Sequence, residues 1–175
     1  MKITKKQLEN YIQMYLDSTG DNVVKRNWGM MLIHRLQCDR KDDNKEHCSI
    51  RWKRLIEGKL EALKRINDFD ELYKAIKAEA DKFYGIGRLT TYDTATCIGF
   101  EQGVYPKDVY LHAGAAEGAR ALGVRGTKAP KTQFVAICKA FEMLEPAQIE
   151  DFLCIYKHKL QGKKKSATTS RGGCC

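Results

Sequence analysis

The spacing of apolar residues constrains the fold of this chain more than any other feature. In most segments, apolar side chains recur at steps of three and four residues, which is the period of an α-helix. Near the N-terminus, Leu8, Ile12 and Tyr15 follow this spacing. We find no convincing alternation of apolar and polar residues of the kind that marks a half-buried strand, and no internal repeat. The sequence therefore predicts an all-α protein, a compact bundle of several helices.

Residues that cap, turn or break a helix mark the expected helix ends. Asn67 and Asp68 precede one apolar stretch as caps, and Pro146 fits the first turn of the last helix. These signals predict helices over residues 2–18, 23–36, 49–66, 70–84, 90–102, 108–122, 131–144 and from 146 onward.

Length and composition fit one globular domain. The chain has 175 residues, of which 43% are hydrophobic and 30% are charged. A chain of this size buries enough surface to form one core. We expect a single helical domain over residues 1–161 and a disordered basic tail over residues 162–175, because the tail is polar and low in complexity.

Targeting signals and cysteines indicate a compartment. No apolar run approaches the roughly 18–20 residues that span a bilayer, and the first residues lack the apolar segment of a secretory signal. Of seven cysteines, Cys97, Cys138 and Cys154 stand among apolar neighbours, as buried free thiols do. Free thiols fit a reducing compartment, so we expect a cytoplasmic protein, or a nuclear one in a eukaryote.

The charge balance favours a polyanionic partner. There are 31 Lys and Arg residues against 22 Asp and Glu residues, a net charge of +9, and basic proteins bind nucleic acids through counterion release. Arg51, Lys53 and Arg54 give the helix over residues 49–66 a basic face, on which Trp52 can stack on a base or bury its ring. We predict that residues 51–54 make a secondary contact with nucleic acid.

The stretch Phe83-Tyr-Gly-Ile-Gly-Arg-Leu-Thr-Thr91, between two predicted helices, is the most informative local motif. A tight connection needs positive φ or close backbone approach, which Gly85 and Gly87 permit. The amides from Gly85 to the next helix then point outward together, and the helix dipole adds partial positive charge. With Arg88 as a neighbouring cation, the stretch predicts an anion site.

This stretch resembles the helix-hairpin-helix motif of DNA-binding and DNA-repair proteins. That motif has an apolar residue, then Gly-apolar-Gly, then a basic or polar residue, and the corresponding residues here are Tyr84, Gly85, Ile86, Gly87 and Arg88, within about residues 70–102. The resemblance implies binding to a phosphate of duplex DNA, a contact that carries no base-sequence information. The implied phosphate site comprises Gly85, Ile86, Gly87, Arg88, Thr90 and Thr91. In the alternative interpretation, the two glycines only make a tight turn between helices.

A second likeness lies downstream of the glycines. In base-excision glycosylases of the helix-hairpin-helix superfamily, an aspartate before a short apolar stretch is catalytic, and Asp108 stands at a similar distance here. The resemblance implies that Asp108 stabilises positive charge on the sugar or activates water. Leu89 or Thr90 stands where bifunctional members carry a nucleophilic lysine, so we expect no lyase activity. Alternatively, Asp108 is a helix N-cap.

His112 is the second candidate catalytic residue. It lies four residues after Asp108, and on the expected helix the two side chains would face each other. A carboxylate and a histidine can move a proton near neutral pH. A surface ion pair is the alternative. The segment over residues 112–119 is rich in small residues, which predicts close packing of another element or a ligand.

Two further patterns are weaker. His34, Cys38, His47 and Cys48 combine ligand types that suit zinc, but their spacing matches no standard finger. The ending Gly172-Gly-Cys-Cys resembles the prenylated tails of some small GTPases, yet the chain lacks their nucleotide-binding motif. We therefore expect no metal, no cofactor and no membrane anchoring through Cys174 and Cys175.

These observations together predict a DNA-binding helix-hairpin-helix protein that acts in DNA repair or modification. In its sharpest form, the hypothesis is a monofunctional base-excision enzyme that uses Asp108. The alternative is a non-catalytic helical module that binds nucleic acid or protein.

Overall fold

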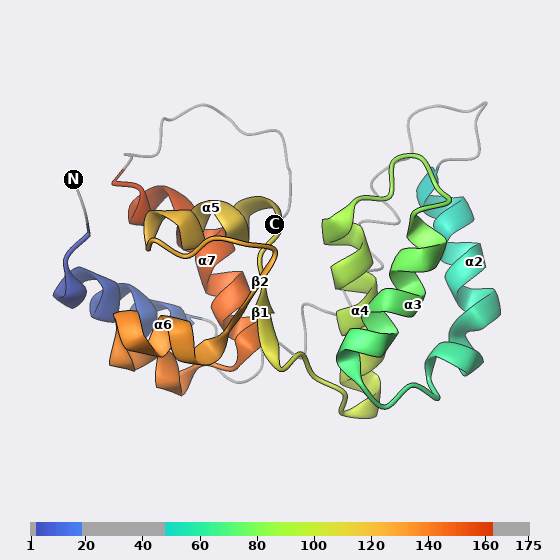
Figure 1. The fold of residues 1–175 in the computed structure, drawn as a ribbon, viewed down its shortest axis with the longest axis horizontal. Coiled ribbons are helices and arrows are strands. Elements are labelled where there is room, and N and C mark those ends of the chain that lie inside the picture. The colour runs from blue at the N-terminus through green and yellow to red at the C-terminus, as the bar shows by residue number, and fades with distance from the viewer. Residues whose placement is uncertain (1–2, 19–47, 163–175) are drawn as a thin grey trace. The chain divides into compact units, whose positions relative to one another are not determined.

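The computed structural model describes residues 3–18 and 48–162 (Figure 1). They are mostly helical, as the all-α class requires, although they include two short strands. A helix over residues 5–18 comes first. It is followed by α2 (Cys48–Leu63), α3 (Phe69–Ala80), α4 (Arg88–Gln102), β1 (Asp108–Tyr110), α5 (Ala113–Ala121), β2 (Lys128–Pro130), α6 (Lys131–Ile137), a 3-10 helix (Lys139–Met143) and α7 (Pro146–Leu160). The predicted helix over residues 23–36 and the tail from residue 163 lie outside the described residues.

The chain divides into two compact units. One comprises residues Asp21–Pro106 and contains α2, α3 and α4, and we call it the hairpin unit. The other comprises Met1–Gly20 and Lys107–Cys175 and contains all the remaining elements, and we call it the ribbon unit. The expectation of one domain over residues 1–161 stays a prediction until the folding of the two units is measured separately.

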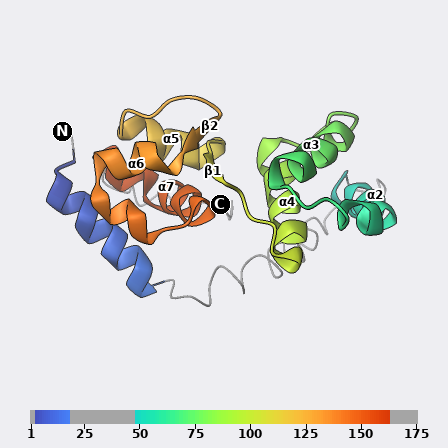
Figure 2. The same cartoon turned by 60° about the horizontal axis from the view of Figure 1, so that its bottom comes forward.

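The helices of the hairpin unit follow from caps and apolar spacing. Asp68 caps α3, because its Oδ1 accepts hydrogen bonds from the amides of Asp70 (2.9 Å) and Glu71 (3.2 Å). The buried face of α3 packs against α4, and both views show these helices side by side (Figures 1 and 2). That face consists of Phe69, Leu72, Ile76 and Ala80.

Helix α4 is buried over most of its length despite its many threonines. Two buried threonine hydroxyls donate to carbonyl oxygens of the preceding turn: Thr94 Oγ1 to Thr90 O (2.7 Å), and Thr96 Oγ1 to Tyr92 O (2.8 Å). Thr94 Oγ1 also accepts a hydrogen bond from Trp52 Nε1 on α2 (3.2 Å). A polar helix can therefore occupy the centre of this unit without buried, unpaired hydroxyls at these positions.

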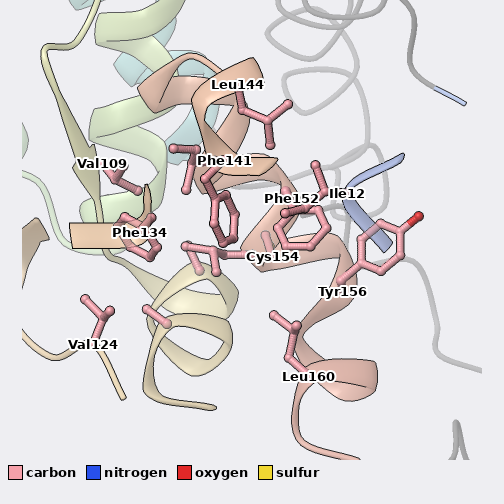
Figure 3. Close-up of a cluster of buried hydrophobic side chains, with 14 of the residues drawn as sticks. Ile12, Val109, Val124, Phe134, Phe141, Leu144, Phe152, Cys154, Tyr156 and Leu160 are labelled. Atoms are coloured by element: carbon pink, nitrogen blue, oxygen red, sulfur yellow. The ribbon is translucent and has the colours of Figure 1, made fainter. Parts of the chain in front are cut away.

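The core of the ribbon unit is aromatic (Figure 3). Phe141 lies between Phe134 and Phe152, at centroid distances of 5.7 and 5.6 Å, and Phe152 stacks on Tyr156 at 4.9 Å. The helix over residues 5–18 packs on this cluster through Leu8, Ile12 and Tyr15. Edge-to-face and offset contacts of this kind add to the burial of apolar area.

The small residues of α5 allow it to approach α7 closely. A Cβ added at Gly118 would lie 2.3 Å from the carbonyl oxygen of Leu153, and one at Gly114 would lie 2.6 Å from Cys154 Sγ. Of the two explanations considered for the segment over residues 112–119, close packing of another element accounts for both glycines.

The predicted helix over residues 108–122 is wrong at its start. Asp108–Tyr110 is a strand that pairs antiparallel with Lys128–Pro130, and α5 begins only at Ala113. The buried Val109 and Leu111 pack into the core, and β-branched and aromatic residues favour a paired, half-buried strand. Ala113 has a φ of +43° at the start of α5, which is uncommon for a residue with a side chain.

The predicted helix over residues 131–144 is also interrupted. Cys138 is extended (φ −150°, ψ 121°) and separates α6 from the 3-10 helix. None of the helices in the described ranges is long and apolar enough to cross a membrane.

Candidate nucleic-acid interface

The glycine turn joins α3 to α4 in the hairpin unit, and its two glycines differ. Gly85 has a φ of +92°, a conformation that favours glycine. Gly87 is the N-cap of α4, with a φ of −93° and a ψ of 178°, a backbone conformation that any residue adopts. A Cβ added at Gly87 would have no atom of the described residues within 4 Å. Only Gly85 is therefore required by the backbone, whereas Gly87 faces open space.

The N-terminus of α4 presents backbone amides without a capping side chain. The amides of the first three helical residues lack an intrahelical acceptor, as in any α-helix, and glycine at the N-cap has no side chain to serve them. The first turn carries Arg88 and no acidic residue. The dipole of this 15-residue helix and the Arg88 guanidinium both favour an anion at this end.

The structure distributes the six predicted phosphate-site residues between surface and interior. Gly85, Gly87 and Arg88 are exposed, and Ile86 and Thr90 are half-buried. Thr91 is 2% exposed, and its hydroxyl donates to Gly87 O at 3.0 Å. The prediction that Thr91 contacts a ligand is therefore wrong, because its side chain serves the helix itself.

The second predicted contact, residues 51–54, reaches the glycine turn through Phe83. The guanidinium carbon of Arg51 lies 5.6 Å from the centroid of the Phe83 ring, within cation–π range. The Trp52 ring packs edge-to-face on Phe83 at 5.9 Å. Phe83 directly precedes Tyr84 and the two glycines, so Arg51 of α2 and the glycine turn belong to one surface.

Trp52 itself is not available to a nucleotide. It is 2% exposed, and its Nε1 donates to Thr94 Oγ1. The interpretation of Trp52 as a stacking residue is therefore wrong, and its alternative, a buried ring, is correct. Lys53 and Arg54 are exposed. Lys53 Nζ lies 3.6 Å from Oε1 of Glu57 in the next turn of α2.

Positive charge in the hairpin unit is local. Residues 51–106 contain ten Lys and Arg and nine Asp and Glu residues, a net charge of +1. Two of these lysines are paired with Glu79: Lys59 Nζ lies 2.7 Å from Oε1, and Lys82 Nζ lies 3.1 Å from Oε2. Hydrogen bonds from both lysines lower the pKa of Glu79. Arg88 lies near Tyr73 on α3, whose pKa is raised by burial and lowered in part by the Arg88 charge. Lys82 of the turn is paired with Glu79, and Arg51 and Arg88 are further exposed cations next to the turn.

The two predicted catalytic residues lie in the ribbon unit and have different partners. Asp108 Oδ2 forms an ion pair with Lys128 Nζ across the ribbon (3.2 Å), with its side chain 33% exposed. His112 is buried at the N-cap of α5, and its Nδ1 lies 3.7 Å from Glu150 Oε1 on α7. The expected helical pairing of Asp108 with His112 is wrong, because Asp108–Tyr110 is a strand.

The same residues show what the sequence reasoning missed. Asp108 is not a helix N-cap either, because α5 begins after His112. Glu150, which lies next to His112, is not among the residues that the sequence predicts for the site. Its only signal is a carboxylate within the apolar face of the last helix, next to Ile149 and Phe152.

Burial raises the pKa values of two further groups, the Cys97 thiol and the Asp151 carboxyl. Burial raises the pKa of the Cys97 thiol to about 12, with smaller contributions from Asp93 and Glu101. Burial also raises the pKa of Asp151, although a hydrogen bond from the Tyr15 hydroxyl (2.9 Å) opposes the shift. A thiol with a pKa this high is a poor nucleophile at neutral pH.

In the described part of the chain, the predicted site residues neither belong to a cluster of metal ligands nor line the hollow of the ribbon unit. Within residues 3–18 and 48–162, no three His, Cys, Asp or Glu side chains gather as a metal site would require. His34, Cys38 and His47, whose side chains suit zinc, and the terminal Cys174 and Cys175 lie outside the described residues. A hollow of about 330 Å³ in the ribbon unit is lined by Ile3, Leu8, Arg120, Leu122, Ile137 and their neighbours, and by none of the predicted site residues.

No protein-family model, no curated protein and no solved structure matches this chain. The likeness to the helix-hairpin-helix superfamily therefore stays a prediction that rests on the residues of the glycine turn.

Proposed function

We propose that this protein binds DNA, and that the surface formed by the glycine turn (residues 81–87), Arg88 and Arg51 contacts a backbone phosphate. The observation that carries the proposal is the position of Gly87. It stands at the N-cap of α4, where Ser, Thr, Asp and Asn cap amides with their side chains, whereas glycine, which is also common there, leaves the amides uncapped. Its backbone needs no glycine, and a Cβ added there would meet no atom of the described residues within 4 Å.

The absence of a side chain at Gly87 has a direct effect on access to the helix. A side chain at the N-cap can reach the first-turn amides of α4, where a phosphate oxygen must approach to within about 3 Å to accept a hydrogen bond. Glycine leaves this path open. Arg88 and Arg51 then supply charge for the phosphate, since the planar guanidinium of arginine can donate two hydrogen bonds to a pair of phosphate oxygens.

The low net charge of the hairpin unit predicts a weak salt dependence of DNA binding. With two arginines beside the turn, the unit neutralises few phosphates, so its affinity falls only gently with salt, by a slope of about −0.9 per phosphate neutralised. Phosphate contacts of this kind carry no base-sequence information. A role in DNA repair or modification fits such binding. The base-excision version rests on Asp108, which is ion-paired with Lys128, and it remains a prediction.

Substitution of Gly87 tests the binding proposal. Gly87→Val fits the extended backbone, and its Cβ meets no described atom within 4 Å. The fold should therefore persist while duplex DNA binding weakens by about tenfold or more, the loss of roughly one charge-assisted hydrogen bond. Fluorescence anisotropy with a labelled duplex at several salt concentrations measures the change.

Gly58 offers a matched control. It lies in α2 of the same unit, and a Cβ added there also meets no described atom within 4 Å. Gly58→Val should bind duplex DNA as the parent does. Equal affinity of Gly87→Val, Gly58→Val and the parent, with intact circular dichroism, would refute the phosphate site.

A further inference from the structure

The hollow of the ribbon unit is built from three separate parts of the chain. Its lining residues come from the start of the helix over residues 5–18, from the end of α5 and from the end of α6. Its volume of about 330 Å³ lies at the lower end of the range for small-molecule sites, which is about 300–1,000 Å³. The hollow therefore has room for one small molecule.

The apolar walls of the hollow are aliphatic. Leu8 belongs to the core of the ribbon unit, and Ile3, Leu122 and Ile137 are half-buried against that core. None of the described residues that line the hollow is aromatic, so it offers no ring on which a base could stack. An aliphatic chain gains from such walls because it buries methylene groups, each of which tightens binding about fourfold.

Two cations line the hollow without an acidic partner. Lys5 and Arg120 are exposed, and neither forms an ion pair with a residue that the structure describes. The described lining residues include no acid. Both side chains can therefore donate hydrogen bonds to an anion in the hollow.

The end of α5 is the feature that opposes an anion here, because a helix C-terminus carries partial negative charge. Two of its carbonyl groups are satisfied within the chain: Ala119 O accepts from the amides of Leu122 (3.0 Å) and Val124 (2.9 Å), and Arg120 O accepts from the amide of Gly123 (3.1 Å). The dipole contributes about half a negative charge, whereas Lys5 and Arg120 contribute two full positive charges. The balance at the hollow therefore favours an anion.

We propose that the hollow binds a small aliphatic anion, with its chain against the aliphatic walls and its carboxylate or phosphate head paired with Lys5 and Arg120. This ligand class follows from the combination of aliphatic walls with two cations. The inference does not depend on DNA binding by the glycine turn, because the hollow belongs to the ribbon unit and the turn to the hairpin unit.

Binding of simple amphiphiles to the full chain tests the proposal. Octanoate and octyl phosphate distinguish the two head groups, and at least one should bind with a dissociation constant below about 1 mM in isothermal titration calorimetry. Shortening the chain of the tighter probe by two methylenes should weaken binding about fifteenfold. Acetate, which lacks the chain, and 1-octanol, which lacks the charge, should bind more weakly than octanoate or octyl phosphate.

Two double variants with the same net charge locate the site. Lys5→Gln combined with Arg120→Gln should weaken binding of the tighter probe by about tenfold, since each exposed charge contributes modestly. The control combines Lys6→Gln with Arg125→Gln, which removes two exposed cations of the ribbon unit that do not line the hollow, and it should bind as the parent does. Circular dichroism checks the fold of both variants.

Three results would overturn the proposal. The first is that neither octanoate nor octyl phosphate binds the parent at concentrations up to about 1 mM. The second is equal affinity of the Lys5 and Arg120 double variant and the parent, or an equal loss in both double variants, which would assign binding to the overall charge. The third is equal affinity for the longer and the shorter chain, which would exclude burial of the chain in the hollow.

Discussion

In the ribbon unit, Gly118 of α5 lies against the backbone of α7, whereas Gly87 in the hairpin unit faces open space. Both glycines belong to helices or their caps, and neither has a positive φ. The difference lies in what occupies the place of the missing side chain, which is another helix in one unit and solvent in the other. A glycine at a packed junction is explained by stability, whereas a glycine at an open helix N-cap leaves the first amides of the helix without a capping side chain. Those amides are then accessible to a ligand.

The largest effect that tests this comparison is expected at Gly118. In Gly118→Ala, the new Cβ would lie 2.3 Å from Leu153 O and 2.9 Å from the Leu153 carbonyl carbon, both backbone atoms that cannot rotate away. Helices α5 and α7 must move apart, at a cost of about 1–3 kcal/mol in the free energy of unfolding. Chemical denaturation measures this cost. Gly87→Val, by contrast, should leave stability nearly unchanged, and a similar loss in both variants would remove the distinction between the two glycines.

The pH dependence of stability offers a second, smaller contrast between the units. In the ribbon unit, burial raises the pKa of Asp151 above its ordinary value of 3.8, so the fold binds this proton more tightly than the unfolded chain does. Its contribution to stability therefore declines as pH rises from about 3.8 through the raised pKa. In the hairpin unit, the lowered pKa of Glu79 means that its contribution is present above 4.5 and is lost as pH falls through the lowered pKa.

Single substitutions separate the pH dependence of stability due to Asp151 from that due to Glu79. Unfolding free energies between pH 3 and pH 8 should show Asp151→Asn gaining stability relative to the parent as pH rises. Glu79→Gln should lose stability relative to the parent over the same rise. Slopes of the same sign in both variants would contradict the assignment of burial to one carboxyl and hydrogen bonding to the other.

The smallest stability effect is expected at Asp108. Asp108→Asn removes a half-exposed ion pair with Lys128, which is worth about 0–1 kcal/mol, and duplex DNA binding should not change because Asp108 is outside the hairpin unit. The assay for base excision is the release of abasic product from modified duplex DNA. If the parent forms this product, the variant should lose it while binding persists. Product formed at equal rates by both would remove Asp108 from catalysis.

The parts of the fold that sequence predicted depend on local signals. Asp68 as a cap and the apolar spacing of Leu72, Ile76 and Ala80 are sufficient to place α3. The ribbon was missed because three-residue strands have too few residues to display a period, and Val109 is paired with Ala129, which is distant in sequence. Cys138 interrupts a helix for a tertiary reason, its burial in the core of the ribbon unit.

The same limit applies to the candidate site. The glycine turn was identified because its signal is contained in consecutive residues. The link from Arg51 to that turn was not, because it runs through Phe83, 32 residues later, and it depends on how α2 packs. Trp52 has the same neighbours in sequence whether it is buried or exposed, so only the packing decides its role. The contact between His112, at the start of α5, and Glu150 of α7 likewise depends on how the two helices pack.

The contact between Arg51 and Phe83 has a consequence for the entropy of binding. A guanidinium held over an aromatic ring by a cation–π contact keeps N–H donors available for an anion. The ring restricts the rotamers of a long side chain before any anion arrives, so less freedom is lost when an anion is bound. Phe83 thereby pre-organises a cation that a solvated surface arginine would have to immobilise at the moment of contact.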